Sequence, residues 1–447
     1  MAHTLSITDG TTTLQLNDLT TVMTVSYPMR SPEVNASTLS ASEDGPPLAS
    51  PVWSNVTETI SLLIRGANPA AVRTTLQTLE RLLDRARQRA VGWGRARCYL
   101  QAQLASEADT WRSEILAGQV VVTDPLGDVW KNSLEVELVI TRRHFWEGPE
   151  TALHMSSVAT AETTDPVVWH NGADNVSGER NYAHIAANRV TGVLPTPLKL
   201  KLVLTGSTQD GLRNIWIGNT VWMDPANLDP ILLGSQAAGG ASHSWATDAW
   251  TTTHSWTIPT ATQTDFAGQM VRPLVAWSTR PNAATVQRGQ VTITLGGIAS
   301  FVVWQNDLIQ EGPGAVRDYG PMPLPPAGLA GVGSTLAVRL QMRRTGGDNV
   351  TAHSLHLMPS GHGVLRHLQM TGFNFGTGVA FVDDGIEDTT TALDGTDAYA
   401  IVRAYHAPVH VWPGRINRLR MLVSKTVWAA GVGWTAQAWF RPRRLTV

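Results

Sequence analysis

Apolar and polar residues alternate along much of this chain with the two-residue period of β-strands. In Glu58–Arg65, Ile60, Leu62 and Ile64 occupy every second position, and Leu134–Arg142 repeats the pattern. Short segments of the same kind recur to the C-terminus and are separated by Gly, Pro, Asn and Asp. The chain is therefore predicted to be mainly β, with antiparallel strands joined by turns.

The predicted strands begin with a hairpin formed by Leu5–Thr11 and Thr12–Leu16, for which Asp9-Gly10 is the turn signal. Ser31–Ser50 is rich in Pro, Ser, Glu and Ala and is predicted to be a long exposed loop. Later strands are predicted at Arg97–Gln103, Glu114–Thr123, Leu134–Arg142, Leu198–Leu204, Asn214–Ile217, Ser255–Ile258, Val271–Trp277, Gln290–Leu295, Phe301–Trp304, Leu336–Met342, His353–Met358, Ala398–Tyr405, Val409–Trp412, Arg418–Val423 and Trp434–Phe440.

One segment, near residues 69–91, has the period of an amphipathic helix instead. Asn68 is a favourable N-cap, Pro69 suits the first helical position, and Gly92 follows the last turn. Apolar residues recur there at steps of three and four. The face predicted to pack on a sheet consists of Val72, Leu76, Leu79, Leu83 and Ala86.

The length of 447 residues exceeds the roughly 250–300 that one core supports, so two or three domains are expected. The run Glu147-Gly148-Pro149-Glu150 suits a boundary, which gives an N-terminal domain of residues 1–150. Residues 151–360 lack helical periodicity and are predicted to form a jelly-roll β-sandwich. Residues 361–447 are predicted to be a C-terminal β segment, either a third small unit or packed on an earlier domain.

Low charge changes the picture of the surface. Only 16% of residues are charged, which suits a protein that covers much of its surface with partners, although a Thr- and Ser-rich monomer has the same composition. The net charge of −2 gives no overall basic field that would attract a nucleic acid. The local basic run Arg441–Arg444 is short. Neither a signal peptide nor an apolar segment long enough to span a membrane is evident. The single cysteine, Cys98, is expected to be buried and inert.

No catalytic, cofactor-binding or metal site is predicted. His353 and His356 have opposite parity on one strand, which disfavours a metal site with His362 and His367. The acidic run Asp383–Asp388 lacks the spacing of a calcium loop and is predicted to be a solvated hairpin turn. Neither a G-x-S-x-G nucleophile motif nor a phosphate-binding loop is found in the sequence.

The tryptophan content is unusually high, with 17 residues against 6 Tyr and 7 Phe. Trp245, Trp250 and Trp256 lie in one polar, Thr-rich segment, where exposed indoles would stack on the apolar faces of sugars. The alternative is that these rings close a sandwich edge or fill a subunit interface, where tryptophan is also enriched. Both interpretations are kept.

Two segments carry a family resemblance. The opening Leu5-Ser-Ile-Thr-Asp-Gly and the strand-then-helix segment Val56–Arg89 resemble the N-terminal domain of phage distal tail proteins, and the ending Trp439–Leu445 looks like a terminus of phage virion proteins. The resemblance implies a β-sandwich with one helix that forms a homo-oligomeric ring, usually a hexamer, at the tail tip. It also implies a galectin-like or carbohydrate-binding-module-like jelly roll after the first domain.

The function implied is that of a structural virion protein, assembled in the host cytoplasm. This protein would be a hub ring that joins the tail-tube protein to the baseplate, fibre or receptor-binding proteins. The alternatives are a glycan-binding adhesin of the tail tip that recognises host-surface carbohydrate, a tail-tube subunit that stacks into filaments, and a polysaccharide-degrading enzyme. The resemblance transfers no catalytic residue.

Overall fold

The computed structural model describes residues 4–35, 52–92, 96–123, 132–157, 160–170, 182–205, 214–219, 243–245, 249–259, 270–277, 286–295, 299–307, 316–318, 320–323, 335–345, 350–360, 362–370, 380–392, 402–423 and 433–446. The chain divides into two compact units. The N-terminal unit comprises Met1–Glu150, Gly192–Leu194 and Arg441–Val447, and the second unit comprises Thr151–Thr191 and Pro195–Phe440. The predicted mainly β class with a helix near the start is confirmed.

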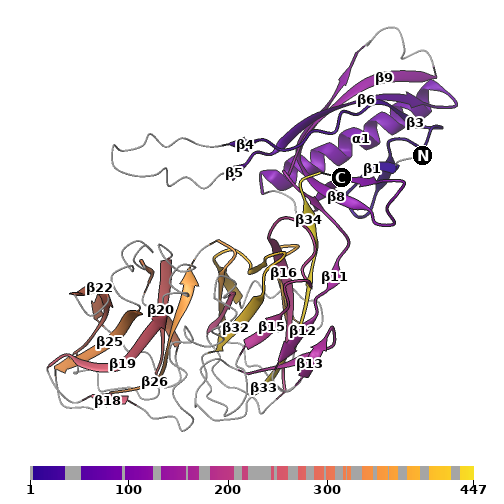
Figure 1. Cartoon of the computed structure of the whole chain (residues 1–447). Coiled ribbons are helices and arrows are strands. Elements are labelled where there is room, and N and C mark those ends of the chain that lie inside the picture. Colours follow the sequence, from indigo (N-terminus) through magenta and orange to yellow (C-terminus); the bar gives the residue numbers. More distant parts are fainter. Residues whose placement is uncertain are drawn as a thin grey trace, which may run out of the picture. The chain divides into compact units, whose positions relative to one another are not determined.

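The N-terminal unit is built on a nine-stranded sheet with the order β2-β1-β7-β8-β9-β6-β3, which β10 and β34 extend from β8. Figure 1 labels several of its strands, among them β6, β8 and β9. Neighbouring strands in this sheet are antiparallel. Its strands are β1 (Thr4–Thr8), β2 (Thr13–Gln15), β3 (Val22–Ser26), β6 (Val56–Arg65), β7 (Cys98–Gln103), β8 (Trp111–Val122), β9 (Ser133–Arg142), β10 (Trp146–Glu147) and β34 (Arg443–Arg444). β4 (Val34–Asn35) and β5 (Val52–Trp53) form a separate two-stranded pair.

Helix α1 (Pro69–Ala90) packs on one face of this sheet, chiefly against β8. The side chain of Asn68 accepts a hydrogen bond from the Ala71 backbone N–H at 2.9 Å, which is the predicted N-cap. Gly118 of β8 lets the helix approach closely, because a Cβ there would lie 2.7 Å from Leu83 Cδ2. The apolar stripe of the helix and the alternating apolar residues of β6 and β9 thus share one core.

Two seven-stranded sheets of the second unit enclose its main core. The first sheet has the order β11-β33-β16-β28-β29, with β14 and β31 at its sides, and the second has the order β13-β12-β15-β32-β17-β27-β30. The first contains β11 (Thr151–Ala152), β14 (Val167–His170), β16 (Thr196–Leu204), β28 (Ala380–Asp384), β29 (Thr389–Ala392), β31 (His410–Val411) and β33 (Gly433–Phe440). The second contains β12 (Met155–Ser157), β13 (Thr160–Thr163), β15 (Tyr182–Ile185), β17 (Asn214–Asn219), β27 (Leu365–Met370), β30 (Val402–Tyr405) and β32 (Asn417–Val423).

Two further sheets are formed by the chain between β17 and β27. The five-stranded sheet contains β18 (His243–Trp245), β20 (Met270–Trp277), β23 (Val316–Asp318), β24 (Met322–Pro323) and β26 (Val350–Ser360). The four-stranded sheet contains β19 (Thr251–Pro259), β21 (Val286–Leu295), β22 (Ala299–Asp307) and β25 (Thr335–Thr345). A small apolar cluster joins Leu274 and Met358 of the five-stranded sheet to Trp216, Leu365 and Leu422 of β17, β27 and β32.

The strands after residue 360 do not form a sheet of their own in the described part of the chain. β28 and β33 flank β16, while β27 and β32 flank β17. The long loop predicted for Ser31–Ser50 lies mostly outside the described residues, and so does most of the connector between β24 and β25. Within the described residues, no helix combines the length and apolar character that a bilayer crossing demands.

Candidate functional site

The C-terminal strand β34 is part of the N-terminal unit, although it follows the whole second unit in sequence. It pairs with β10 through Trp146–Arg444 and Glu147–Arg443. On its other side, the backbone carbonyl of Arg443 accepts a hydrogen bond of 2.7 Å from the Val193 N–H. Three distant segments of the sequence therefore meet in one small piece of sheet.

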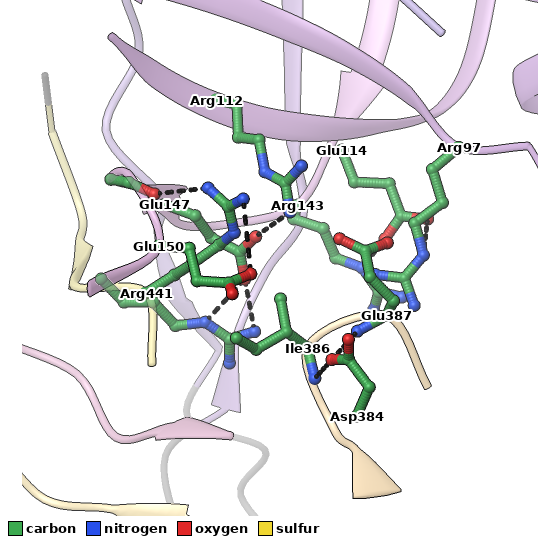
Figure 2. A network of polar contacts seen from close by, with 12 residues as sticks. Arg97, Arg112, Glu114, Arg143, Glu147, Glu150, Asp384, Ile386, Glu387 and Arg441 are labelled. Atoms are coloured by element: carbon green, nitrogen blue, oxygen red, sulfur yellow. Dashed lines mark hydrogen bonds and ion pairs between the residues drawn. The ribbon is translucent and has the colours of Figure 1, made fainter. Parts of the chain in front are cut away.

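Where β34 pairs with β10, which we call the C-terminal closure, Glu147 is the acidic residue that two arginines share. Its Oε1 accepts a hydrogen bond of 2.6 Å from Arg443 Nη2, and its Oε2 lies 3.5 Å from Arg112 Nη2. The carboxylate and both guanidinium groups are largely buried. Burial lowers the pKa of Arg443, and the charge of Glu147 opposes that change. Figure 2 draws Arg112, Glu147 and Arg441 within the same polar network.

Arg444, the next residue of β34, is held by Glu107 and Trp111. Arg444 donates two hydrogen bonds to Glu107, one of 3.0 Å and one of 2.9 Å, and its guanidinium lies 3.6 Å from the centre of the Trp111 ring. Trp111 in turn donates to Glu107 through Nε1 at 2.7 Å. Arg444 therefore has both charge and stacking partners inside the protein.

Arg441 completes the run by donating to the Gly148 carbonyl at 2.9 Å and facing Glu150 at 4.0 Å (Figure 2). The arginines of the predicted basic run thus face acidic and carbonyl groups of their own chain.

A fully buried ion pair lies at another place in the N-terminal unit. Arg142 Nη2 donates to Glu58 Oε1 at 2.7 Å, and the Tyr27 hydroxyl donates to Glu58 Oε2 at 2.7 Å. Arg142 also donates to the Arg30 carbonyl at 3.1 Å. Burial and the negative charge of Glu58 raise the pKa of Tyr27. The network holds residues 27–30 against the sheet, just before the chain enters the β4–β5 pair.

Leu19 is presented to solvent by a turn that Asp18 holds in place. Asp18 Oδ1 accepts backbone hydrogen bonds from Thr20, Thr21 and Val22, at 2.9, 2.7 and 2.9 Å. Burial opposes ionisation of Asp18, but these backbone donors outweigh it and lower its pKa. Leu19 itself has φ 62°, a left-handed conformation that non-glycine residues rarely adopt, and its side chain is 66% exposed. Strained backbone of this kind persists where the surrounding structure holds it, and it is commonest at functional sites.

Val25 adds to this apolar edge. It falls in a register shift between Thr24 and Ser26, where β3 pairs with β6, and its side chain is 60% exposed. In the described part of the sheet, β3 is the last strand on this side. A bulge on an edge strand disfavours indiscriminate strand pairing, so contact here would be made by side chains.

The second unit contains a row of stacked rings on three adjacent strands. The rings of Trp216 and His367 are parallel within 2°, with centroids 4.4 Å apart, and His367 and Tyr405 follow at 5.2 Å and 21°. His367 Nε2 is 2.9 Å from Asn214 Oδ1, an acceptor, so this nitrogen carries the proton. Burial lowers the pKa of His367 to about 4, so the ring is neutral near pH 7.

The three tryptophans selected from the sequence lie on or beside different strands. Trp245 is in β18 and Trp256 is in β19, while Trp250 lies just before β19. The Arg343 guanidinium covers Trp250, 4.6 Å from its ring centre. Whether the three rings form one sugar-binding surface stays a prediction.

The residues selected for the helix face lie on α1. Val72, Leu79, Leu83 and Ala86 are buried against the sheet, and Leu76 packs at the margin of the same core. Leu82, which the predicted face omits, is buried as well.

Cys98 is also buried, and burial raises its thiol pKa to about 12.

The acidic run differs from the prediction. β28 and β29 do form a hairpin there, but Asp383 and Asp384 are buried rather than solvated. Arg366 neutralises Asp383 with bonds of 2.9 and 3.2 Å, and Asp384 accepts the backbone N–H groups of Ile386 and Glu387 (Figure 2). The partner of Asp383 lies 17 positions away, which local sequence could not reveal.

Histidine placement is now clear for two of the four residues considered. His367 lies in the stacked row, and the His362 ring lies 5.6 Å from that of His410. No group of three or more His, Cys, Asp or Glu side chains suited to a metal occurs among the described residues. The side chains of His353 and His356 lie outside the described residues.

Comparison with known proteins gives matches in structure alone. No protein-family model matches the sequence, and no curated protein matches it. The chain is similar to the SPP1 Dit protein, titled a paradigm of the hub adsorption apparatus in phages that infect Gram-positive bacteria. That match has 10% identity and a TM-score of 0.36, and it covers 99% of each chain. A second match is a chain of the phage P2 baseplate in its activated conformation with calcium, at 8% identity, TM-score 0.33 and full coverage of both chains. The two titles name a phage hub adsorption apparatus and a phage baseplate.

Several of the residues described above escaped sequence reasoning. Leu19 had a local signal, since Asp18 followed by Thr20-Thr21 is typical of a side-chain-capped turn. The ion pairs Glu58–Arg142 and Glu147–Arg443 had none, because their members are 84 and 296 positions apart.

Proposed function

We propose that this chain is a structural, non-enzymatic component of a phage tail tip. In this proposal several copies, six in the simplest case, form a hub ring through their N-terminal units. The ring joins the tail-tube protein to baseplate or fibre proteins and is part of the virion. The role named in the titles of the two structural matches is the origin of the proposal, and the support comes from three features of the chain itself.

The observation that carries the proposal is the presentation of Leu19. A leucine held at positive φ costs roughly 1–2 kcal/mol relative to the right-handed region. The same side chain gains nothing from burial in the free chain, because it is 66% exposed. A strained backbone that holds an apolar side chain in solvent favours a residue that becomes buried when copies assemble.

The second feature is the difference between the two edges of the N-terminal sheet. One end strand is β3, which carries the exposed Val25, and the other is the short strand β2; the loop that joins them carries the exposed Leu19. An edge that meets a different surface of the next copy makes a head-to-tail contact. Head-to-tail contacts repeated by rotation close into rings.

The third feature is topological. The N-terminal unit contains both the first strands and the last strand, while the second unit is inserted between them. The N-terminal unit is therefore complete only after β34 has been added to its sheet. Ring formation through this unit would depend on that step.

The test is native mass spectrometry of the purified full chain, with particle images of the same sample. Wild-type protein is expected to form a closed ring. Leu19→Gly is expected to abolish the ring without harming the fold, because glycine accepts the positive φ and lacks only the side chain. Val91→Ser is the matched control, since Val91 is 57% exposed at the C-terminal end of α1 and is distant from β3 in sequence.

A wild-type chain that stays monomeric at high concentration, also with tail-tube protein added, would overturn the hub proposal. Rings that form equally well with Leu19→Gly would leave the hub standing and remove Leu19 from its interface. Open filaments instead of discrete rings would favour a tail-tube subunit.

A further inference from the structure

The row Trp216–His367–Tyr405 ends at an edge of its sheet. The three residues are direct cross-strand partners, since Trp216 pairs with His367 and His367 pairs with Tyr405. Trp216 is buried, His367 is half-buried, and Tyr405 is 41% exposed. β30, which carries Tyr405, is the last strand on this side of the sheet in the described residues. One face of the Tyr405 ring stacks on His367, and among the described residues β30 has no hydrogen-bonded strand on its outer side.

The Tyr405 ring is also held in a fixed orientation. Stacking on His367 fixes the ring plane, and a hydrogen bond of 3.0 Å joins the hydroxyl to Gln369 Oε1. An exposed tyrosine that is immobilised in this way has already lost the rotational freedom that a ligand would otherwise have to remove. It is a preorganised apolar platform.

Hydrogen-bond donors line the next row of the same strands. Gln369 pairs with Arg403 across β27 and β30, directly beside the pair of His367 and Tyr405. Gln369 uses its carbonyl oxygen toward Tyr405, so its amide N–H groups face no acceptor in the described part of the chain. Arg403 is exposed and has no ion-pair partner among the described residues. A flat apolar surface thus adjoins two groups of donors.

We infer that the outer face of Tyr405, with Gln369 and Arg403 beside it, is a binding site for a pyranose sugar of a glycan. A pyranose has one face of C–H groups, which stacks on an aromatic ring, and a rim of hydroxyls, which accept from amide and guanidinium donors. A purely apolar partner would leave these donors without acceptors. A nucleobase would also stack, but the chain's net charge of −2 gives no basic groove for a phosphate backbone.

The site differs from the tryptophan segment considered earlier, and it goes beyond the hub role. The ring row lies on β17, β27 and β30, whereas Trp245, Trp250 and Trp256 lie on or beside β18 and β19. Sugar binding and ring formation are separate measurements, so either proposal stands or fails without the other.

The test uses the methyl pyranosides of glucose, galactose and N-acetylglucosamine as probes, titrated into the full chain by ligand-observed NMR. At least one probe is expected to bind at millimolar concentration. Tyr405→Ala is expected to weaken binding by about tenfold or more, as loss of one stacking platform does elsewhere. Tyr405→Phe keeps the platform and should stay within about threefold of wild type, and Arg403→Ala should fall between the two.

Circular dichroism and thermal unfolding of each variant separate binding from folding, and Trp250→Ala is the control at the other aromatic segment. The proposal is overturned if none of the probes binds to wild type, or if Tyr405→Ala binds as wild type does. Loss of binding in folded Trp250→Ala, with Tyr405→Ala unaffected, would move the sugar site to the tryptophan segment.

Discussion

Arg142 donates a hydrogen bond to Glu58 across 2.7 Å, and both side chains are fully shielded from solvent. The guanidinium also lies 4.7 Å from the centre of the Trp146 ring and donates to two backbone carbonyls. A buried charge with so many partners depends on each of them, because removing one partner leaves the other charged and without compensation.

Glu58→Gln is therefore expected to lower the free energy of unfolding by about 3–5 kcal/mol. Tyr27→Phe removes only one hydrogen bond to the same carboxylate and should cost about 1–2 kcal/mol. Urea titration of both variants measures the difference. Equal costs for the two variants would show that the charge of Glu58 is not what stabilises this site.

The C-terminal closure gives a second prediction. Glu147→Gln leaves Arg443 and Arg112 buried with a weaker partner, and we expect a loss of about 2–4 kcal/mol in the N-terminal unit. Asp84→Asn is the matched control, because the Asp84–Arg87 pair is exposed and should contribute less than about 0.5 kcal/mol. Hydrogen exchange resolves the N-terminal unit from the second one. Undiminished protection of β10 in Glu147→Gln would contradict the prediction.

Met358 lies directly over Gly218, where a Cβ would clash with the end of the methionine side chain. Met358→Ala opens a cavity in the small cluster and should cost about 2–4 kcal/mol. Gly218→Ala in wild type displaces Met358 and should cost about 1–2 kcal/mol. In the double variant the added methyl group has space, so the two costs should fall short of their sum by about 1 kcal/mol or more. Strict additivity in denaturant unfolding would mean that the two residues do not touch.

His367 predicts a dependence of stability on pH. Its folded pKa is about 4, below the value of roughly 6.5 in unfolded chains, so the unfolded state takes up a proton first as the pH falls. Stability from this residue is complete above about pH 6.5 and declines by on the order of 2–3 kcal/mol as the pH falls to about 4. Asp318 counteracts the effect, whereas His406 and Arg272 add to it.

The comparison is with His367→Phe, which keeps the stacked row and cannot titrate. Its unfolding free energy should change less than that of wild type between pH 7 and pH 4. His144, whose pKa burial also lowers to about 4, is present in both proteins and cancels in the difference. Parallel pH profiles would contradict the assignment.

The helix cap gives a last prediction. Asn68→Ala removes the acceptor for the Ala71 N–H and should cost about 1 kcal/mol. Asn68→Ser replaces it with another good cap and should stay within about 0.5 kcal/mol of wild type. Thermal unfolding of the two variants is sufficient to compare them.

Local pattern predicted the secondary structure well, because strand alternation and helix capping depend on neighbouring residues. The hairpin at Asp9-Gly10, the strand at β6 and the start of α1 at Pro69 all lie where the pattern predicts them. The sheet order did not follow from that pattern. β16 begins at Thr196 and borders β28 and β33, which begin 184 and 237 positions later, at Ala380 and Gly433. Register over such separations is set by the folded core rather than by adjacent residues.

The candidate sites were less predictable for the same reason. Asp383 looked solvated in sequence, because its counter-charge, Arg366, is on another strand. Tyr405 looked like one more strand aromatic, and only the register that places it beside His367 and Trp216 distinguishes it. Composition points to the tryptophans instead, because a residue count does not depend on which strands are neighbours.

The pairing of β10 with β34 has a consequence for the evolution of this chain. Glu147 and Arg443 are neighbours across two antiparallel strands, and Thr151 and Phe440 are neighbours a few residues further on. The outgoing and returning backbones therefore start and end the second unit about one strand spacing apart, roughly 5 Å. A different module with closely spaced termini could occupy the same position in a gene. The N-terminal sheet would lose only the short Gly192–Leu194 segment, so the sequences of the two units are free to evolve at different rates.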